Sequence, residues 1–306
     1  RDVSSMCAGD GVLFYGCWYD NEILALDARN GTIIWRRTTP AVTRDALYYN
    51  GKLYTSALKR DITTYNGTTG EIVWTWQGGF RTYFSNTGCA GDGFFFDKAV
   101  DVPAGFVGCW DDATGELRWK IPGYYYIGYF STFYDDGKVY AILQDSRGLS
   151  ETEVEAGKVK ALSACIDAMT GQILWTVPFQ IGHSTGAGAG DFRGDVAIAY
   201  GCLFVEYYNV LYCVSDIQPP KDWPNYRGNV MQNAVDKSQL GAAPSDVRYP
   251  KWSFKTGAYV SATPAVANGK VFVGSQDGKI YCLDAYNGTK IWNCTTKWRV
   301  LASCAY

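Results

Sequence analysis

Few side chains in this sequence are of the types that catalyse reactions or bind metal ions. His183 is the single histidine, which argues against a multi-histidine metal site. It precedes the glycine-rich segment 184–195, which lacks the Gly-Lys-Ser/Thr of a phosphate-binding loop and is not followed by an expected helix. Charged residues at comparable repeat positions would either form a ligand site or meet water in a central channel. These candidate channel residues are Arg44, Asp45, Arg81, His183, Asp191 and Arg193. The sequence predicts no catalytic, cofactor-binding or metal-binding set.

The ten cysteines are the second group with chemical potential. None stands in a CxxC, CxxCH or adjacent Cys-Cys pair, so the usual zinc, c-type haem and thioredoxin-like spacings are absent. Their even, dispersed distribution favours disulfides and an oxidising compartment, and buried thiols are the alternative. Cys202 and Cys213 flank an expected hairpin turn and fall almost opposite each other, so we predict a register-sensitive cross-strand disulfide. Other pairings cannot be read from sequence.

Four Asn-x-Ser/Thr triplets offer sites for N-linked glycans if the chain is secreted. Their acceptor residues are Asn30, Asn66, Asn287 and Asn293. Three of the triplets overlap turns of the repeat described below, so turn chemistry is the alternative reason for them. The most apolar stretch, Val196–Val214, contains Glu206 and Asn209 and is typical of two strands rather than a membrane-spanning helix. We expect an extracellular, periplasmic or cell-surface location, with peripheral association with a cell envelope and no transmembrane segment.

The elements that carry these residues are expected to be strands. Among 306 residues, 34 glycines, 23 tyrosines and 11 tryptophans are typical of twisted sheets and tight turns. The hydrophobic share of 47% excludes wholesale disorder, and the balance of 28 basic and 30 acidic residues argues against nucleic acid as a partner. Asp-Gly and Asn-Gly pairs predict two-residue hairpin turns between short antiparallel strands. They stand at 10–11, 50–51, 92–93, 136–137 and 268–269 and, between later strands, at 277–278.

An eleven-residue pattern recurs along the chain. The copies are ALDARNGTIIW (25–35), TYNGTTGEIVW (64–74), CWDDATGELRW (109–119), CIDAMTGQILW (165–175) and CLDAYNGTKIW (282–292). A degenerate copy begins at Cys213 and reaches its tryptophan only at Trp252. We interpret the first, small residue as leaving room for a ring, and the Asp or Asn as bonding backbone donors of the turn. The tryptophan would bury a large face while its N–H finds an acceptor.

This pattern resembles the tryptophan-docking repeat, A-x-D-x-x-T-G-x-x-x-W, of the pyrroloquinoline-quinone-like β-propeller family. The resemblance covers nearly the whole chain, and it implies radially arranged four-stranded blades with tryptophans docked between neighbouring blades. The docking residues would be Trp35, Trp74, Trp119, Trp175, Trp252 and Trp292. Propellers host many functions, so the resemblance is specific for the fold and not for an activity.

We therefore expect an all-β protein, a β-propeller of four-stranded antiparallel blades with six complete repeats and part of a seventh. The chain 1–306 is predicted to be a single propeller with an insertion at 217–250. The predicted blades are 1–39, 40–79, 80–122, 123–180, 181–256 and 257–298. Residues 299–306 would start a further blade or supply a ring-closing strand, and a seven- or eight-bladed ring with missing parts is the alternative.

The insertion contains Lys221–Asn229, which is similar to the W-P-x-[FY]-R-G-[DN] segment that opens many members of this family. Here the segment lies inside the chain, which suggests a permuted or fused boundary. One interpretation is a loop that faces a partner or ligand. The other is a strap that packs Trp223 and Tyr226 onto the propeller.

These observations favour an extracytoplasmic propeller that acts as a protein-binding or assembly scaffold without catalysis or cofactor. A structural subunit of a cell-surface layer or filament is one alternative, and its partner would be a second copy. The resemblance implies another, a quinoprotein dehydrogenase that uses pyrroloquinoline quinone and calcium. Many such enzymes stack the quinone on an adjacent-cysteine disulfide, and this sequence has no Cys-Cys pair. The expected partner is accordingly a protein, either another chain or a second copy.

Overall fold

The structure is a computed structural model. It describes residues 3–17, 21–39, 43–57, 61–77, 88–101, 104–122, 129–130, 132–145, 160–178, 193–194, 196–199, 202–207, 209–214, 250–260 and 263–300. These described residues form strands, turns and bends but no helix. Contacts divide the chain into two compact units, and each is described by itself. The first unit holds residues 1–126 together with the turn 168–171, and the second holds the later strands.

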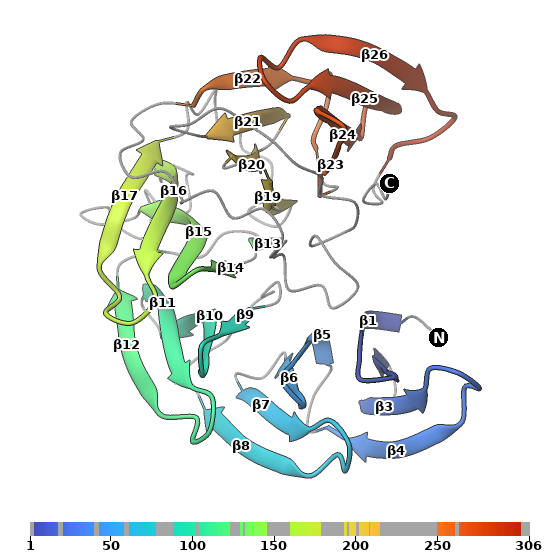
Figure 1. Ribbon diagram of the computed structural model, residues 1–306, viewed down its shortest axis with the longest axis vertical. Coiled ribbons are helices and arrows are strands. Elements are labelled where there is room, and N and C mark those ends of the chain that lie inside the picture. The colour runs from blue at the N-terminus through green and yellow to red at the C-terminus, as the bar shows by residue number, and fades with distance from the viewer. Residues whose placement is uncertain are drawn as a thin grey trace. The chain divides into compact units, whose positions relative to one another are not determined.

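Three four-stranded antiparallel sheets, called blades 1 to 3, build the first unit. In each, strands that follow one another in the chain lie side by side, and the fourth strand lies at the outer edge (Figure 1). Blade 1 is β1 (Val3–Gly9), β2 (Val12–Cys17), β3 (Glu22–Asp27) and β4 (Ile33–Thr38). Blade 2 is β5 (Thr43–Tyr49), β6 (Lys52–Ala57), β7 (Asp61–Asn66) and β8 (Ile72–Gln77). Blade 3 is β9 (Cys89–Gly91), β10 (Phe94–Asp101), β11 (Ala104–Asp111) and β12 (Leu117–Pro122).

Blades 4 to 6 have the same topology and lie in the second unit. Blade 4 is β14 (Thr132–Asp135), β15 (Lys138–Asp145), β16 (Lys160–Asp167) and β17 (Ile173–Pro178). Blade 5 is β19 (Val196–Ala199), β20 (Cys202–Tyr207), β21 (Val210–Val214) and β22 (Trp252–Lys255). Blade 6 is β23 (Ala265–Ala267), β24 (Lys270–Ser275), β25 (Lys279–Asp284) and β26 (Lys290–Thr295). A short parallel pair joins β13 (Tyr129–Phe130) to β18 (Arg193–Gly194).

These sheets confirm the all-β class and the four-stranded antiparallel repeat. One expectation is wrong: the stretch Val196–Val214 forms three strands rather than two, because the chain turns between Ala199 and Cys202 as well as between Tyr207 and Val210. The predicted single domain stays a prediction. Residues 217–249 of the predicted insertion and 301–306 of the predicted seventh unit lie outside the described residues.

The hairpin turns adopt the backbone that their sequences predict. Both residues of the pair have positive φ at the first turn of a blade, for example 51° at Asp10 and 76° at Gly11, or 48° at Asn50 and 76° at Gly51. The same holds at 92–93, 136–137 and 268–269. Positive φ at both positions matches the right-handed twist of the flanking strands. These turns fix the register of the first two strands in five of the six blades. The later pair at 277–278 differs from the prediction, because only Gly278 has positive φ there.

Strand register explains the first and last residues of the eleven-residue pattern. In every blade the small residue on the third strand lies directly opposite the tryptophan on the fourth. The pairs are Ala25 with Trp35, Thr64 with Trp74, Cys109 with Trp119, Cys165 with Trp175, Cys213 with Trp252 and Cys282 with Trp292. All six small residues are buried. A larger side chain there would compete for space with the cross-strand indole.

An aromatic residue on the second strand completes the packing inside each blade. Its ring centroid lies 5.9 to 6.3 Å from that of the tryptophan in the same blade. The pairs are Phe14–Trp35, Tyr54–Trp74, Phe96–Trp119, Tyr140–Trp175, Phe204–Trp252 and Phe272–Trp292. Such tilted pairs add to the stabilisation from buried area. Each blade therefore carries its own aromatic core, which holds the tryptophan in a fixed orientation.

Candidate functional site

The repeated functional feature is a contact between the tryptophan of one repeat and the turn before the fourth strand of the next. The indole N–H of Trp35 donates to the carbonyl of Gly67 at 2.8 Å, and that of Trp74 donates to the carbonyl of Asp112 at 2.8 Å. In the first unit Trp119 bonds Ala168 in the same way at 2.9 Å. In the second unit Trp252 bonds Ala285 at 3.1 Å. These four indole donors are therefore satisfied by a backbone acceptor in a different repeat. The indole N–H of Trp175 is also buried, but it has no hydrogen-bond partner among the described residues.

A glycine in the same turn lies against the indole face. A Cβ atom at Gly70 would come within 2.6 Å of the Trp35 ring, and one at Gly115 within 2.7 Å of the Trp74 ring. Gly171 and Gly288 face Trp119 and Trp252 at 2.7 and 2.5 Å. These distances are well inside van der Waals contact, so the ring occupies the space that a side chain would take. We call this turn, with its carbonyl and its glycine, the docking turn.

The Asp or Asn of the pattern holds the docking turn in shape. The Asp111 carboxylate accepts the backbone N–H groups of Ala113 and Thr114, both at 3.0 Å. Arg118 donates to the other oxygen of the same carboxylate at 2.8 Å. Burial raises the pKa of Asp111, but these hydrogen bonds outweigh it and hold that pKa below its usual value. Asn66 and Asp284 make the corresponding pairs of backbone bonds.

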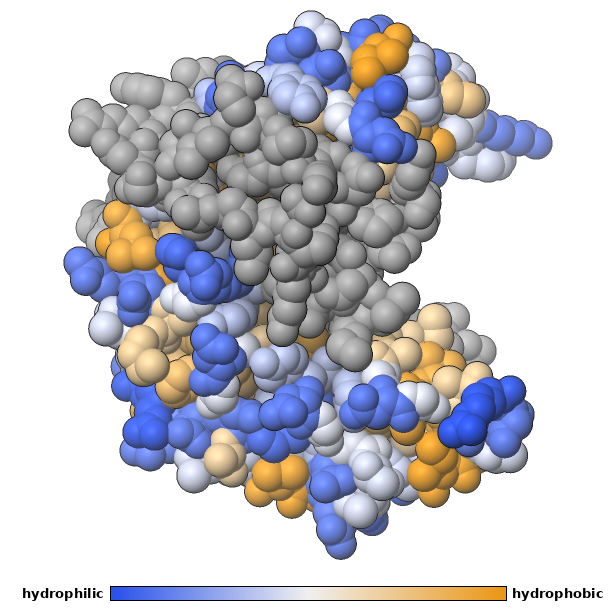
Figure 2. All heavy atoms as spheres, in the orientation of Figure 1, coloured by the Kyte–Doolittle hydropathy of each residue, from blue (hydrophilic) through white to orange (hydrophobic). Residues whose placement is uncertain are grey.

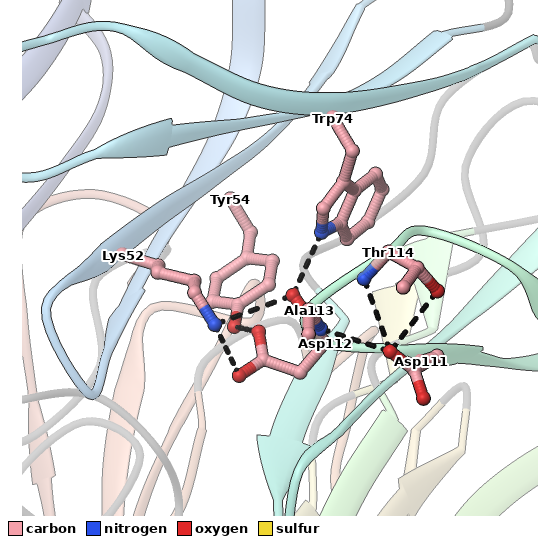
Figure 3. Close-up of polar contacts among 7 residues, drawn as sticks. All are labelled: Lys52, Tyr54, Trp74, Asp111, Asp112, Ala113 and Thr114. Carbon is pink, nitrogen blue, oxygen red and sulfur yellow. Dashed lines mark hydrogen bonds and ion pairs between the residues drawn. The ribbon is translucent and has the colours of Figure 1, made fainter.

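One docking turn carries an additional buried charge. Asp112 occupies the position held by Ala28, Ala168 and Ala285 in other repeats, and its side chain lies against blade 2 (Figure 3). Its carboxylate is 2.6 Å from the Lys52 ammonium and accepts a hydrogen bond from the Tyr54 hydroxyl. Burial raises the pKa of Tyr54, and the hydrogen bond to Asp112 raises it further, so the phenol stays protonated and donates. We call this group the Lys52–Asp112 cluster.

Two further tyrosine–aspartate hydrogen bonds involve hairpin turns of blades 1 and 6. Tyr48 on β5 donates to Asp10 in the first hairpin turn of blade 1 at 2.6 Å. Tyr281 on β25 donates to Asp277 at 2.5 Å, and Asp277 also accepts the backbone N–H of Gly257 at 2.9 Å. The Gly257 bond ties the end of blade 5 to a turn of blade 6. Burial raises the pKa of Asp277, but the bonds from Tyr281, Gly257 and other donors more than offset it and leave that pKa below its usual value.

The structure leaves the predicted channel residues untested. Arg44 and Asp45 lie on β5, where a bulge interrupts the register between Thr43 and Asp45, and Arg193 lies on β18. The orientation of these three side chains is not described. Arg81, His183 and Asp191 lie outside the described residues. A ligand site formed by these residues stays a prediction.

The two predicted disulfide partners lie close together, although not directly opposite. Tyr207 pairs with Val210 and Phe204 with Cys213, so Cys202 stands two residues along its strand from the position opposite Cys213. Their side chains hydrogen-bond to each other, which together with burial raises the pKa of the Cys213 thiol. Burial also raises the pKa of Cys109 and of Cys165 to about 12. Four cysteines therefore occupy the small-residue position of the repeat, and the disulfide stays a prediction.

The four predicted glycan acceptors are all exposed. Asn30 accepts the backbone N–H of Thr32 at 2.9 Å, and Asn287 accepts that of Thr289 at 2.9 Å. These bonds show that the side chains of Asn30, Asn66 and Asn287 also shape their turns. Asn293 lies on the outer strand β26, opposite Tyr281. Their glycosylation stays a prediction.

Comparison with known families fits this geometry. The family model described as outer membrane protein assembly factor BamB matches residues 4–88 and 104–298. The chain belongs to this family. The match covers all of the eleven-residue copies that carry the docking turns.

Solved structures of this fold include the BamB family and several enzymes. BamB from Moraxella catarrhalis is similar with a TM-score of 0.67 and 14% identity, over 98% of this chain and 78% of that chain. Quinohemoprotein alcohol dehydrogenase from Comamonas testosteroni has a TM-score of 0.55 and 14% identity, over 99% and 68% of the two chains. A europium-containing methanol dehydrogenase has a TM-score of 0.51 and 13% identity, over 97% and 78%. Together with the BamB family match, these likenesses confirm the propeller fold class, and they carry no function.

One curated relative is closer in sequence over a shorter length. Tetrathionate hydrolase of Acidithiobacillus ferrooxidans is 30% identical over 164 residues, which is 51% of this chain and 31% of that protein. The chain therefore matches less than a third of the length of this relative.

Proposed function

We propose that this chain is an extracytoplasmic propeller scaffold that binds a protein partner and does not catalyse a reaction. The observation that carries the proposal is the match to the BamB family over residues 4–88 and 104–298, since that family is described as an assembly factor for outer membrane proteins. The same description supports a location in the cell envelope. None of the described segments is a helix of the length and hydropathy that crossing a membrane requires.

The use of the polar residues supports a scaffold. The carboxylate of Asp112 is bound by Lys52 and Tyr54, and that of Asp277 is bound by Tyr281 and the Gly257 backbone. Both carboxylates hold neighbouring repeats together. These two carboxylates are thereby assigned to packing between blades rather than to a substrate.

Exposed apolar residues on the outer strands offer a protein-binding surface. Ile33 and Ile34 on β4, and Ile72 and Val73 on β8, are all exposed, with Ile72 reaching 62%. Figure 2 shows hydrophobic residues at the surface along this part of the first unit. We call these four residues the outer apolar face. β8 is also the edge of its sheet and carries no charged side chain, so nothing on it opposes pairing with a partner.

A binding experiment tests the scaffold. The purified chain is immobilised, exposed to solubilised envelope proteins of its source cells, and the retained protein is then purified and titrated against it. We expect Ile72→Ser with Val73→Ser to weaken this binding at least tenfold, since the exposed face would lose its apolar contacts. Met169→Ser is the matched control, because Met169 is even more exposed than Ile72 but lies outside the outer apolar face. Retention of no protein would contradict the proposal.

Hydrolysis of tetrathionate is the second candidate function. The observation that favours it is the 30% identity to tetrathionate hydrolase over 164 residues. We assign no residue of this chain to that reaction. An assay of the purified chain for consumption of tetrathionate separates this function from the scaffold. Turnover that rises in proportion to the chain concentration would replace the scaffold with an enzyme.

The quinoprotein alternative finds no site among the described residues. No three described His, Cys, Asp or Glu side chains converge to hold a metal ion. The buried carboxylate of Asp112 is already neutralised by Lys52. The described residues thus do not fit pyrroloquinoline quinone with calcium, and we assign no step to that group. If the purified chain kept a quinone absorbance band after incubation with the cofactor and calcium and removal of the excess, the quinoprotein alternative would be supported.

A further inference from the structure

Five Asn-Gly pairs occur in this chain, and such pairs can react without an enzyme. They stand at 30–31, 50–51, 66–67, 268–269 and 287–288. The backbone nitrogen of the glycine can attack the side-chain amide of the asparagine, because glycine has no Cβ to shield that nitrogen. The rate of this attack depends on how firmly the turn holds the two reacting groups, and the structure divides the five pairs on this point.

Three of the pairs lie in the turn before a fourth strand, where both reacting groups are held. The N–H of Gly67 donates to the Gly51 carbonyl at 2.8 Å. The side-chain oxygen of Asn66 accepts two backbone N–H groups of its own turn, at 2.9 and 3.0 Å. The pairs at 30–31 and 287–288 are held by the same two kinds of hydrogen bond. To react, each of these pairs must first break the bonds that shape its turn.

The pair at 50–51 is different, because it forms the two-residue turn between β5 and β6. Asn50 is exposed. None of the residues that the structure describes accepts a hydrogen bond from the N–H of Gly51 or bonds the side chain of Asn50. Asn268 begins the corresponding turn of blade 6, and its carbonyl accepts a hydrogen bond from Lys270 at 3.5 Å. Asn50 and Gly51 are thus the reacting pair that the described chain restrains least.

We propose that Asn50 is a site of slow deamidation and isomerisation in the folded chain. The Gly51 nitrogen loses its proton as it bonds to Cγ of Asn50, and the Cγ–Nδ2 bond breaks. The departing –NH2 group takes up a proton and leaves as ammonia, which closes a five-membered succinimide ring. Water then opens the ring, at Cγ to give aspartate or at the backbone carbonyl carbon to give isoaspartate. The reaction needs water alone and neither an oxidant nor a reductant.

The two products differ in what they do to the turn. Aspartate fits, since blades 1, 3 and 4 carry Asp at this turn position with φ of 51°, 48° and 44°. Isoaspartate lengthens the backbone by one methylene, which a two-residue turn does not accommodate without a change of strand register. The Gly51 carbonyl accepts the Gly67 N–H, and the Gly67 carbonyl accepts the Trp35 indole N–H. Isoaspartate at position 50 therefore loosens the docking of Trp35.

Peptide mapping by mass spectrometry tests the proposal on the purified, folded chain stored at mildly alkaline pH. Asn66 is the internal control, because Asn50 and Asn66 both stand in the sequence Tyr-Asn-Gly. We expect Asn50 to lose ammonia at least about tenfold faster than Asn66, whose turn must first lose its hydrogen bonds. In concentrated urea, where neither turn is formed, the two rates should agree to within about twofold.

A second measurement tests the effect on docking. Methylation by an isoaspartate-specific methyltransferase identifies the chains that carry isoaspartate at position 50. These chains should unfold at a lower urea concentration than the Asn50→Asp variant, which carries the other product.

Equal rates at Asn50 and Asn66 in the folded chain would overturn the proposal. It would also be overturned if Asn50 kept its amide in the folded chain and lost it only in urea. Isoaspartate chains as stable as the Asn50→Asp variant would contradict the effect on Trp35. All of these results are independent of whether the outer apolar face binds a protein partner.

Discussion

The indole N–H of Trp74 reaches the backbone carbonyl of Asp112 at 2.8 Å, across 38 residues of sequence and from one blade to the next. The same residue, Asp112, presents its carboxylate to Lys52 and Tyr54. One turn thus receives three side chains from blade 2. This turn therefore holds blade 3 against blade 2 through polar contacts.

Replacing Trp74 by Phe should destabilise the chain by about 1–3 kcal/mol, because the Asp112 carbonyl would lose its buried donor. Denaturant unfolding monitored by circular dichroism measures this change. Trp298→Phe is the control and should leave the free energy of unfolding within about 0.5 kcal/mol of its original value, since Trp298 is 76% exposed. Equal effects of the two substitutions would contradict the docking role of Trp74.

Asp112→Ala restores the residue that other repeats carry, yet it should be destabilising. It leaves the partly buried Lys52 ammonium without its partner, at a cost of about 2–4 kcal/mol. Adding Lys52→Val and Tyr54→Phe should recover most of that loss, because blade 1 already has Val12 and Phe14 at these positions. Unfolding curves of the single and triple variants check this. A triple variant no more stable than Asp112→Ala would show that the cluster does not act as a unit.

Tyrosine ionisation should limit stability in alkali. Burial, with the hydrogen bond to Asp277, raises the pKa of Tyr281 from 10.0 to about 12. The folded phenol therefore holds its proton more tightly than the unfolded one, and the stabilisation it gives is complete below pH 10 and lost as the pH rises towards 12. The urea concentration at the midpoint of unfolding should fall between pH 10 and pH 12, and it should fall less steeply in the Tyr281→Phe variant. Tyr286→Phe is the control at an exposed tyrosine and should keep the steeper fall. Identical slopes would contradict this origin.

Asp277 sets the opposite limit. Its pKa lies below the usual 3.8 in the folded chain, so its stabilisation is present above that pH and is lost as the pH falls through the folded value. Asp277→Asn should make stability less dependent on pH in this acid window. Thermal unfolding at several acid pH values measures the dependence. Glu116→Gln, at an exposed residue of blade 3, serves as the comparison, and an equal change in it would contradict the role of Asp277.

The parts of this fold that sequence predicts are those encoded within a few residues. The Asp-Gly and Asn-Gly turns and the four-stranded repeat follow from local backbone chemistry, which tertiary contacts do not override. The Lys52–Asp112 cluster could not be predicted from local sequence, because Lys52 and Asp112 are 60 residues apart. A signal for it existed: Asp112 stands where Ala28, Ala168 and Ala285 stand in other copies of the pattern.

Two other features, the aromatic partner of each tryptophan and the offset between the two cysteines, could not be predicted from the sequence because they also depend on packing and register. The aromatic residue on each second strand, such as Phe14 or Tyr54, recurs three positions after the turn glycine or its equivalent. Only the packing shows that it meets the tryptophan. The offset between Cys202 and Cys213 depends on strand register, and a change of one or two residues at a turn alters it. Function is less accessible still, because the repeat encodes how blades pack and not what they bind.

Gly115 offers a way to isolate docking from backbone strain. Gly115 and Gly137 have φ of 73° and 70°, so alanine at either costs similar backbone energy. Only Gly115 has the Trp74 ring within 2.7 Å of a Cβ position, while Gly137 faces open space. Gly115→Ala should therefore be more destabilising than Gly137→Ala by about 1–3 kcal/mol in denaturant unfolding. Equal costs would mean that the indole does not occupy this turn in solution.

A double-mutant cycle between Trp74 and Gly115 tests most directly whether indoles dock on the turns of the following repeat. The free energy of unfolding is measured for the unaltered chain, Trp74→Ala, Gly115→Ala and the double variant. Docking predicts that Gly115→Ala costs less once the ring is gone, with a coupling energy of about 1–3 kcal/mol. Additive effects, with no coupling between the two positions, would contradict it.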